Sequence, residues 1–405
     1  MPNMSAVQVP TRQRACYVNP DSAFLAARWL RGAARGPVRL VYAEGARELA
    51  ESLRNEHAPD ATVVPEDAAG DGGEIILPLA LDHRPLRHQA GALLPDVRPH
   101  YPLIARLWRA GYRRFTWCSL AGEQALELPH LLESFRDRHK GQRCFVVGNG
   151  PSLNQIDMAR LKDEITFGSN RCYMGFPDWG FEFTYWGIYD ALQIEEYGPE
   201  YEANVPPGPV KFYPYAYWPL LRLPNACPIA MDWPRAAPRE FSTDPHRLIV
   251  GYSVTFMLLQ IAAFMGCDPI YLVGLDHRYH ITRPQLMTRA VRLSGKWVAR
   301  HFDHTPWYRA AEGAVDAWRK AQRSGGEARA RIWQANDAAG ATHFTSKYTS
   351  EQKRFLMPRP QDAERDYECA LAWARANGRS IVNATPNSAL RVFPMVAFDQ
   401  LFQQG

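Results

Sequence analysis

Short runs of apolar and β-branched residues, separated by glycine-rich or polar turns, recur along this chain of 405 residues. In its longer C-terminal part they predict strands at 144–147, 165–169, 181–188, 270–273 and 380–382. Thr255 to Met265 is apolar almost all round, which predicts a fully buried helix, and 362–377 predicts a second helix. This alternation indicates an α/β fold with a mostly parallel, Rossmann-like sheet covered by helices on both faces.

The ends of these helices carry recognisable signals. Ser253 is suited to the N-cap of the buried helix, because its hydroxyl oxygen accepts from a backbone N–H of the first turn. Gly266 and Gly378 each follow a helix, where the left-handed conformation of a C′ residue favours glycine.

The N-terminal part predicts a smaller α/β domain over residues 13–125, after a disordered tail at 1–12. Its expected strands are 37–42, 61–64, 74–79 and 114–118, and its expected helices are 46–55 and 101–110. A scaffolding or docking role is the default interpretation of this domain, and a nucleotide-binding role is the alternative.

The remaining chain, 126–405, predicts a nucleotide-binding catalytic domain. We expect a connecting helix at 128–139 and, from the Pro and Trp content, a long loop without regular structure at 205–238. Residues 278–340, rich in Arg, Lys and Trp, predict a helical insertion.

Composition narrows the class of protein. A content of 46% hydrophobic and 22% charged residues is typical of a soluble globular enzyme. The net charge of +5 is small for this length and does not indicate nucleic-acid binding. Its seven cysteines form no CxxC pair, which favours reduced thiols and a cytoplasmic location over zinc or disulfides. No apolar run reaches 18 residues, so we expect no membrane span, while peripheral association stays open.

The first strand of the C-terminal part runs into the turn Gly148, Asn149, Gly150 and then into Pro151 and Ser152. A strand followed by a glycine turn and a helix start is a common way to present backbone N–H groups to a phosphate. An ordinary strand-to-helix turn is the alternative, because short glycine motifs have many false positives.

Polar residues also follow the other predicted strands, namely Asn170, Asp190, Asp276 and His277. In open parallel sheets, ligands bind outside the carboxyl ends of the strands. The architecture therefore predicts that these side chains converge with Asn149.

Five segments in this order resemble the MptE-like family: GNGPSL (148–153), DEITFGSNRCYM (163–174), SVTFMLLQIAAFMGCDPIYLVGLDH (253–277), THF (342–344) and NATPNSALRVFP (383–394). That family is named for the archaeal 6-hydroxymethylpterin pyrophosphokinase and includes bacterial motility-accessory and surface-glycan proteins. The GNGPSL opening, the asparagine after the second strand and the PNS-containing end are also similar to bacterial CMP-sialic-acid sialyltransferases. The resemblance covers roughly residues 142–401.

The resemblance implies a sialyltransferase-like fold with a nucleotide pocket. The resemblance assigns nine residues to nucleotide binding: Gly148, Asn149, Gly150, Ser152, Asn170, Ser253, Thr255, Asn387 and Ser388. We add Asp190 to them because it follows a predicted strand. The resemblance places Asp276 and His277 at the reactive edge and makes His343 the counterpart of a catalytic base. Tyr279 is the residue that could assist the leaving phosphate, although Arg278 separates it from the usual position. Asp276 could instead cap the next turn or bind Mg²⁺ together with a diphosphate.

The leading hypothesis is a glycosyltransferase that moves a sugar, such as a CMP-activated acidic one, from a nucleotide donor to a cell-surface glycan or protein acceptor. It requires no cofactor. A second hypothesis is diphosphate transfer from ATP to a hydroxymethylpterin, with Mg²⁺ held by Asp276. A third is a nucleotide-binding scaffold without catalytic activity.

Overall fold

The computed structural model describes residues 14–33, 38–68, 73–79, 81–89, 91–119, 122–232, 240–278, 343–345, 347–350 and 358–403. The predicted tail at 1–12, Tyr279 and all but the first residue of the predicted insertion lie outside these ranges. The chain forms two compact units. The first contains Met1–Arg136, Ile188–Trp233 and Asp244–Leu248, and the second contains Asp137–Gly187, Pro234–Thr243 and Ile249–Gly405. The boundary expected at residues 125–126 stays a prediction.

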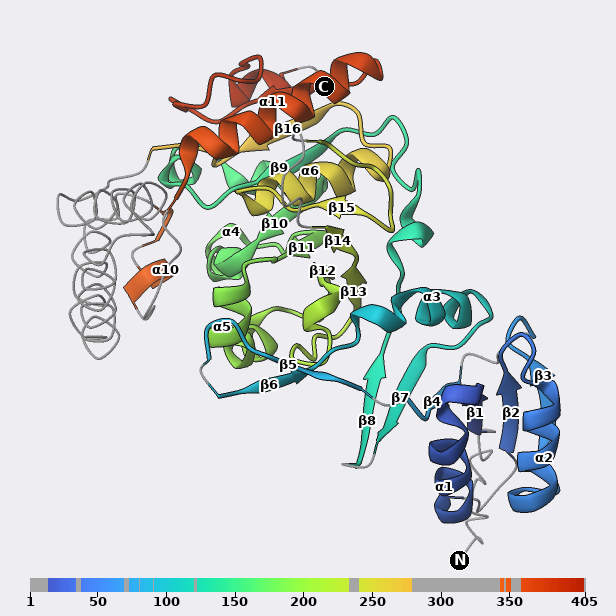
Figure 1. Ribbon diagram of the computed structural model, residues 1–405. Coiled ribbons are helices and arrows are strands. Elements are labelled where there is room, and N and C mark those ends of the chain that lie inside the picture. Colours follow the sequence, from blue (N-terminus) through green and yellow to red (C-terminus); the bar gives the residue numbers. More distant parts are fainter. Residues whose placement is uncertain are drawn as a thin grey trace, which may run out of the picture. The chain divides into compact units, whose positions relative to one another are not determined.

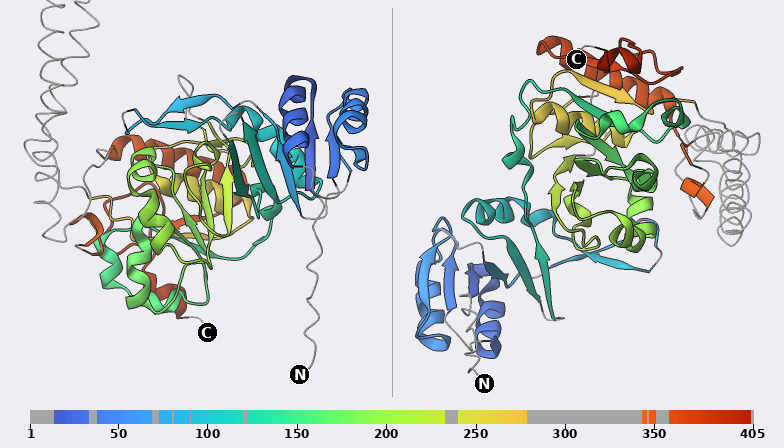
Figure 2. Two further views of the ribbon diagram at one scale, coloured as in Figure 1. Left: turned by 90° about the horizontal axis from the view of Figure 1, so that it is seen from below. Right: turned by 180° about the vertical axis from the view of Figure 1, so that it is seen from behind.

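The N-terminal part of the first unit is built on a six-stranded sheet of order β3-β2-β1-β4-β7-β8 (Figure 1). The strands are β1 (Arg14–Val18), β2 (Val38–Tyr42), β3 (Thr62–Pro65), β4 (Glu74–Leu77), β7 (Arg114–Ser119) and β8 (Gly122–Glu127). All pair in parallel except β7 with β8. Helices α1 (Ala23–Ala33) and α2 (Arg47–His57) pack on each other, and α3 (Tyr101–Arg109) precedes β7 (Figures 1 and 2). The strands and helices expected here are confirmed, and β1, α1 and β8 are additions.

Three strands lie where a loop was expected at 205–238, namely β12 (Val210–Pro214), β13 (Ala226–Ile229) and β14 (Met231–Asp232). The sequence also did not predict β5 (His83–Pro85), β6 (Leu93–Pro95), α5 (Ala191–Asn204) and β15 (Leu248–Ile249). The prediction that 205–238 lacks regular structure is therefore wrong for its described residues. Pro214 ends β12 and Pro228 lies in the edge strand β13, where a residue without an N–H is tolerated.

The helix expected at 128–139 is also wrong. Only Leu132–Phe135 forms a helical turn, of the 3-10 type (η3). Leu131 is extended before it, and Asp137 has a positive φ of 54° after it. Burial of Leu132 and Phe135, with Phe135 packed on Phe212, holds this irregular connection in place.

The larger sheet has the order β13-β12-β11-β10-β9-β16-β17, with β9 (Cys144–Val147), β10 (Ile165–Ser169), β11 (Tyr185–Gly187), β16 (Ile270–Val273) and β17 (Ile381–Asn383). Its strands are parallel, which confirms the predicted α/β class with a large, mostly parallel sheet. From β9 the chain adds strands in one direction as far as β13 and then returns to the other side of β9 with β16. Between β9 and β16 the order reverses, and such a switch point is where open α/β sheets bind ligands.

Helix α6 (Val254–Phe264) packs on β9, β10 and α11 (Pro360–Ala376) (Figure 1). Ser253 accepts from the Thr255 N–H at 3.1 Å, and Gly266 and Gly378 have positive φ, so the predicted cap and C′ residues are confirmed.

Within the described ranges, no helix has the length and apolar character that crossing a membrane requires. The short elements are η1 (Pro20–Ser22), η2 (Arg98–His100), η4 (Pro151–Gln155), η5 (Met158–Leu161), η6 (Asn170–Gly175), α4 (Phe176–Trp179), η7 (Tyr215–Tyr217), α10 (Lys347–Ser350) and η8 (Phe398–Phe402).

Candidate functional site

The glycine turn after β9 lies directly against the turn after β16. Gly148 N–H donates to the Val273 carbonyl at 2.8 Å, and Gly150 N–H donates to the Gly274 carbonyl at 2.9 Å. A Cβ atom added to Gly150 would lie 1.9 Å from Asp276 Oδ2, and one added to Gly148 would lie 2.4 Å from the Gly274 oxygen. These glycines therefore allow two backbone turns to meet at the switch point.

Ser152 and Asp276 join these two turns through their side chains. The Ser152 hydroxyl donates to Asp276 Oδ2 at 2.6 Å, and the Ser152 N–H lies 3.2 and 3.3 Å from the two carboxylate oxygens. The N–H groups of Gly148, Gly150 and Ser152 thus all have acceptors within the protein. A phosphate at this turn would have to compete with Asp276 for Ser152, and the predicted phosphate contacts stay a prediction.

Asn149 and Asn170 follow the adjacent strands β9 and β10. Asn149 Nδ2 donates to the Ser169 carbonyl at 3.2 Å, whereas Asn170 has a positive φ of 51° and its carbonyl accepts from Trp186 Nε1 at 2.7 Å. The side-chain oxygens of both asparagines are buried and accept no hydrogen bond. Because buried polar atoms are rarely left without partners, these two oxygens are candidate acceptors for a ligand.

His343 is connected to this pair of asparagines through Phe344 and Tyr348. The Phe344 N–H donates to the Asn149 carbonyl at 3.0 Å, and Asn154 Nδ2 donates to the Phe344 carbonyl at 2.8 Å. The His343 ring stacks on Tyr348 with centroids 4.0 Å apart, and the Asn170 side chain donates a hydrogen bond to the Tyr348 hydroxyl oxygen. The predicted residues Asn149, Asn170 and His343 are thus brought together.

His277 belongs to a second group around the start of α11. Its Nε2 lies 3.1 Å from Glu364 Oε1, its side chain is 6% exposed, and a further hydrogen bond joins the imidazole to the Pro360 backbone. The Ser253 hydroxyl lies 2.7 Å from the hydroxyl of Tyr367, whose ring centroid is 6.4 Å from that of His277. These contacts connect the starts of α6 and α11 with the turn after β16.

Burial lowers the pKa of His277 from its ordinary 6.5, and Glu364 opposes this effect. The folded protein then binds fewer protons than the unfolded chain between the lowered pKa and 6.5, so its free energy of unfolding decreases as pH falls through this window. We expect His277→Gln to flatten that decrease, measured by urea unfolding at pH 7.5, 6.5 and 5.5. Parallel pH profiles for the variant and the unmodified protein would contradict this prediction.

The other predicted residues have structural contacts. Ser388 is buried and donates to the Leu275 carbonyl at 2.6 Å, which fixes the segment after β17 against β16. Asn387 is exposed, with a positive φ of 53°, and its carbonyl accepts from Arg278 Nη2 at 3.0 Å. Thr255 is buried in the first turn of α6.

Asp190 caps α5 by accepting from the Leu192 N–H at 2.9 Å, and burial raises the pKa of its carboxyl group. It belongs to the first compact unit, whereas the other described candidates belong to the second. Its predicted contact with a nucleotide therefore stays a prediction.

Sequence reasoning missed several residues around these groups. Glu364 and Tyr367 lie one turn apart on α11. Their spacing of three positions places both side chains on one face of the helix, and this was the sequence signal that could have identified them. Arg171 follows Asn170, is fully buried and donates to the Tyr348 carbonyl. Tyr348 is also fully buried, which raises the pKa of its hydroxyl. Neither residue belongs to a sequence pattern that predicts these contacts.

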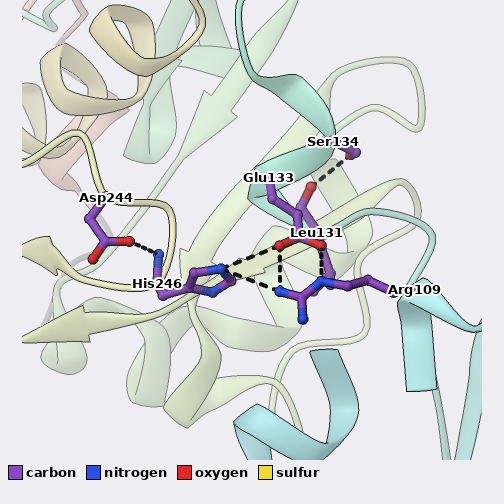
Figure 3. Close-up of polar contacts among 6 residues, drawn as sticks. All are labelled: Arg109, Leu131, Glu133, Ser134, Asp244 and His246. Carbon is purple, nitrogen blue, oxygen red and sulfur yellow. Dashed lines mark hydrogen bonds and ion pairs between the residues drawn. The ribbon is translucent and has the colours of Figure 1, made fainter. Parts of the chain in front are cut away.

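A polar cluster in the first unit has a different character. Arg109 donates through Nε and Nη2 to both carboxylate oxygens of Glu133 at 2.7 Å, and His246 Nε2 lies 3.3 Å from Glu133 Oε2 (Figure 3). The hydrogen bonds from Arg109 lower the pKa of Glu133. Because Arg109 and His246 are 49% and 43% exposed, we interpret the cluster as a surface connection between α3, η3 and the segment before β15.

Comparison with known proteins identifies no relative. The chain matches no family model, no curated protein and no solved structure. The resemblance to the MptE-like family therefore rests on the sequence motifs alone. Among the described residues, no three His, Cys, Asp or Glu side chains are grouped so as to hold a metal ion, and Mg²⁺ at Asp276 stays a prediction.

Proposed function

We propose that this protein is a glycosyltransferase whose donor is a sugar activated by a nucleotide, with CMP and an acidic sugar as the preferred pair. The acceptor is a cell-surface glycan or glycoprotein, and the reaction takes place in the cytoplasm. We also propose that the larger sheet and its helices form a Rossmann-like fold of the sialyltransferase type, with helices on both faces of the sheet. The observation that carries it is the grouping of His343 with two unsatisfied asparagine oxygens at the carboxyl ends of β9 and β10.

The two asparagine oxygens suit the donor groups of a nucleotide. Ribose hydroxyls and the amino group of cytosine both present hydrogens, and Asn149 Oδ1 and Asn170 Oδ1 present acceptors. A buried acceptor without a partner costs about 1–3 kcal/mol, which a bound hydroxyl or amino group would offset. Nucleotide binding would in this way satisfy atoms that the protein alone leaves unsatisfied.

In the proposed reaction His343 removes the proton from the acceptor hydroxyl. The hydroxyl oxygen then forms a bond to the anomeric carbon while the bond from that carbon to the phosphate oxygen of the nucleotide breaks. Stacking on Tyr348 fixes the plane of the His343 ring. His277 is less suited to be the base, because its imidazole is engaged with Glu364 and the Pro360 backbone, and we assign it a positioning role.

Diphosphate transfer from ATP remains a second candidate because of Asp276. Its carboxylate lies against the glycine turn, where a Mg²⁺ ion could bridge it to a diphosphate. A nucleotide-binding scaffold is the third candidate, and it would bind nucleotide without turnover.

The experiment that tests the proposal is a thermal-shift screen with CMP, UDP, GDP and ATP, each with Mg²⁺ and with EDTA. A ligand at a hundredfold excess over its Kd stabilises the folded state by about 2.7 kcal/mol. We expect CMP to stabilise the protein in EDTA and Asn149→Ala to reduce this shift. The matched control is Asn204→Ala, which changes an exposed asparagine in α5. Stabilisation by ATP with Mg²⁺ alone would instead support diphosphate transfer.

If CMP binds, incubation with CMP-activated acidic sugars distinguishes an enzyme from a scaffold. Release of CMP, by transfer to an acceptor or by slow hydrolysis, supports the proposal. Binding without any release of CMP would contradict it and support the scaffold.

A further inference from the structure

We infer that Asp276 makes the site selective for one phosphate over a diphosphate in the absence of a divalent cation. This inference rests on the proposed function and adds a specificity-determining residue to it. The Asp276 carboxylate already accepts from the N–H and the hydroxyl of Ser152, two residues after Gly150.

The Asp276 carboxylate is held by neutral groups. Its side-chain contacts are the hydroxyl and the N–H of Ser152, and in the part of the chain that the structure describes no Lys, Arg or His forms an ion pair with it. Hydrogen bonds from a neutral hydroxyl and amide leave the formal charge in place. The Asp276 carboxylate therefore keeps its own negative charge at the meeting point of the two turns.

This charge lies where phosphate groups would approach. Asp276 Oδ2 is so close to the turn that a Cβ on Gly150 would lie 1.9 Å away from it. A phosphate beside the turn would be within a few ångströms of the carboxylate, and every additional negative charge on the ligand would be repelled. For charges about 6 Å apart at a dielectric constant between those of water and protein, one added charge costs about tenfold in affinity.

CMP and CDP form a suitable ligand pair, because they share base and ribose and CDP carries roughly one more negative charge at pH 7.5. We would measure both Kd values by isothermal titration calorimetry in EDTA. The expected result is that the unmodified protein binds CMP more tightly than CDP, and that Asp276→Asn reduces this preference by about tenfold. Asparagine keeps the shape and an acceptor for Ser152 but removes the charge.

Ser152→Ala is the matched control, since it removes a hydrogen bond to the carboxylate and leaves the charge. It should weaken both ligands alike and keep the preference for CMP. A second measurement needs no variant: raising the salt from about 0.05 to 0.5 M shortens the screening length from above 10 Å to below 5 Å, so the preference of the unmodified protein should shrink.

The outcomes separate the two proposals. An unchanged ratio of the Kd values in Asp276→Asn, or a ratio insensitive to salt in the unmodified protein, would overturn the inference and leave the proposed function standing. Binding of neither CMP nor CDP would overturn both.

Discussion

Replacing His343 by alanine should lower kcat for sugar transfer by about 10²- to 10⁴-fold, the usual contribution of a general base. The expected change in KM for the donor is small, because the Asn149 and Asn170 oxygens, rather than the imidazole, are the proposed nucleotide contacts. The measurement is steady-state transfer from a CMP-activated sugar, followed over a range of pH.

His277→Ala provides the comparison. Because His277 contacts Glu364 and the start of α11, its loss should affect stability and donor KM more than kcat. The result that contradicts the base assignment is a His343→Ala enzyme with normal kcat beside a His277→Ala enzyme without turnover. Normal kcat in both variants would remove both histidines as candidates.

Gln260→Leu should lower the free energy of unfolding by about 2–6 kcal/mol. Gln260 is fully buried in α6, and its Oε1 accepts from the N–H groups of Ile249 and Ser242 at 2.9 and 3.2 Å. Its Nε2 donates to the carbonyls of Ile249 and Phe256 at 2.8 and 3.3 Å. Leucine fills a similar volume but leaves the N–H groups of Ile249 and Ser242 without acceptors, and each such buried group costs about 1–3 kcal/mol.

The measurement is urea unfolding at neutral pH, compared with Gln400→Leu as the matched control. Gln400 is exposed in η8, where a substitution usually changes stability by less than about 0.5 kcal/mol. Equal effects of the two substitutions would show that the hydrogen bonds of Gln260 are not needed.

Local signals were sufficient for most of the sheet and for the best-defined helix. Ser253, the apolar run after it and Gly266 specify a helix start, a buried interior and a helix end. Those preferences act between residues a few positions apart, so a single sequence reveals them. The same reasoning failed at 205–238, because proline content is a weaker guide than the position of a strand in its sheet: Pro228 is acceptable only because β13 is an edge strand.

By itself, the sequence determined the alternation of strands and helices, the helix caps and the set of polar residues that follow the strands. Only the tertiary structure decided which of them meet. Asp276 contacts Ser152 across 124 positions of chain, and His277 pairs with Glu364 across 87. Such pairings depend on the order of the strands and on the packing of whole helices. Local preferences act between residues a few positions apart, so they do not determine which two turns meet at a switch point of the sheet.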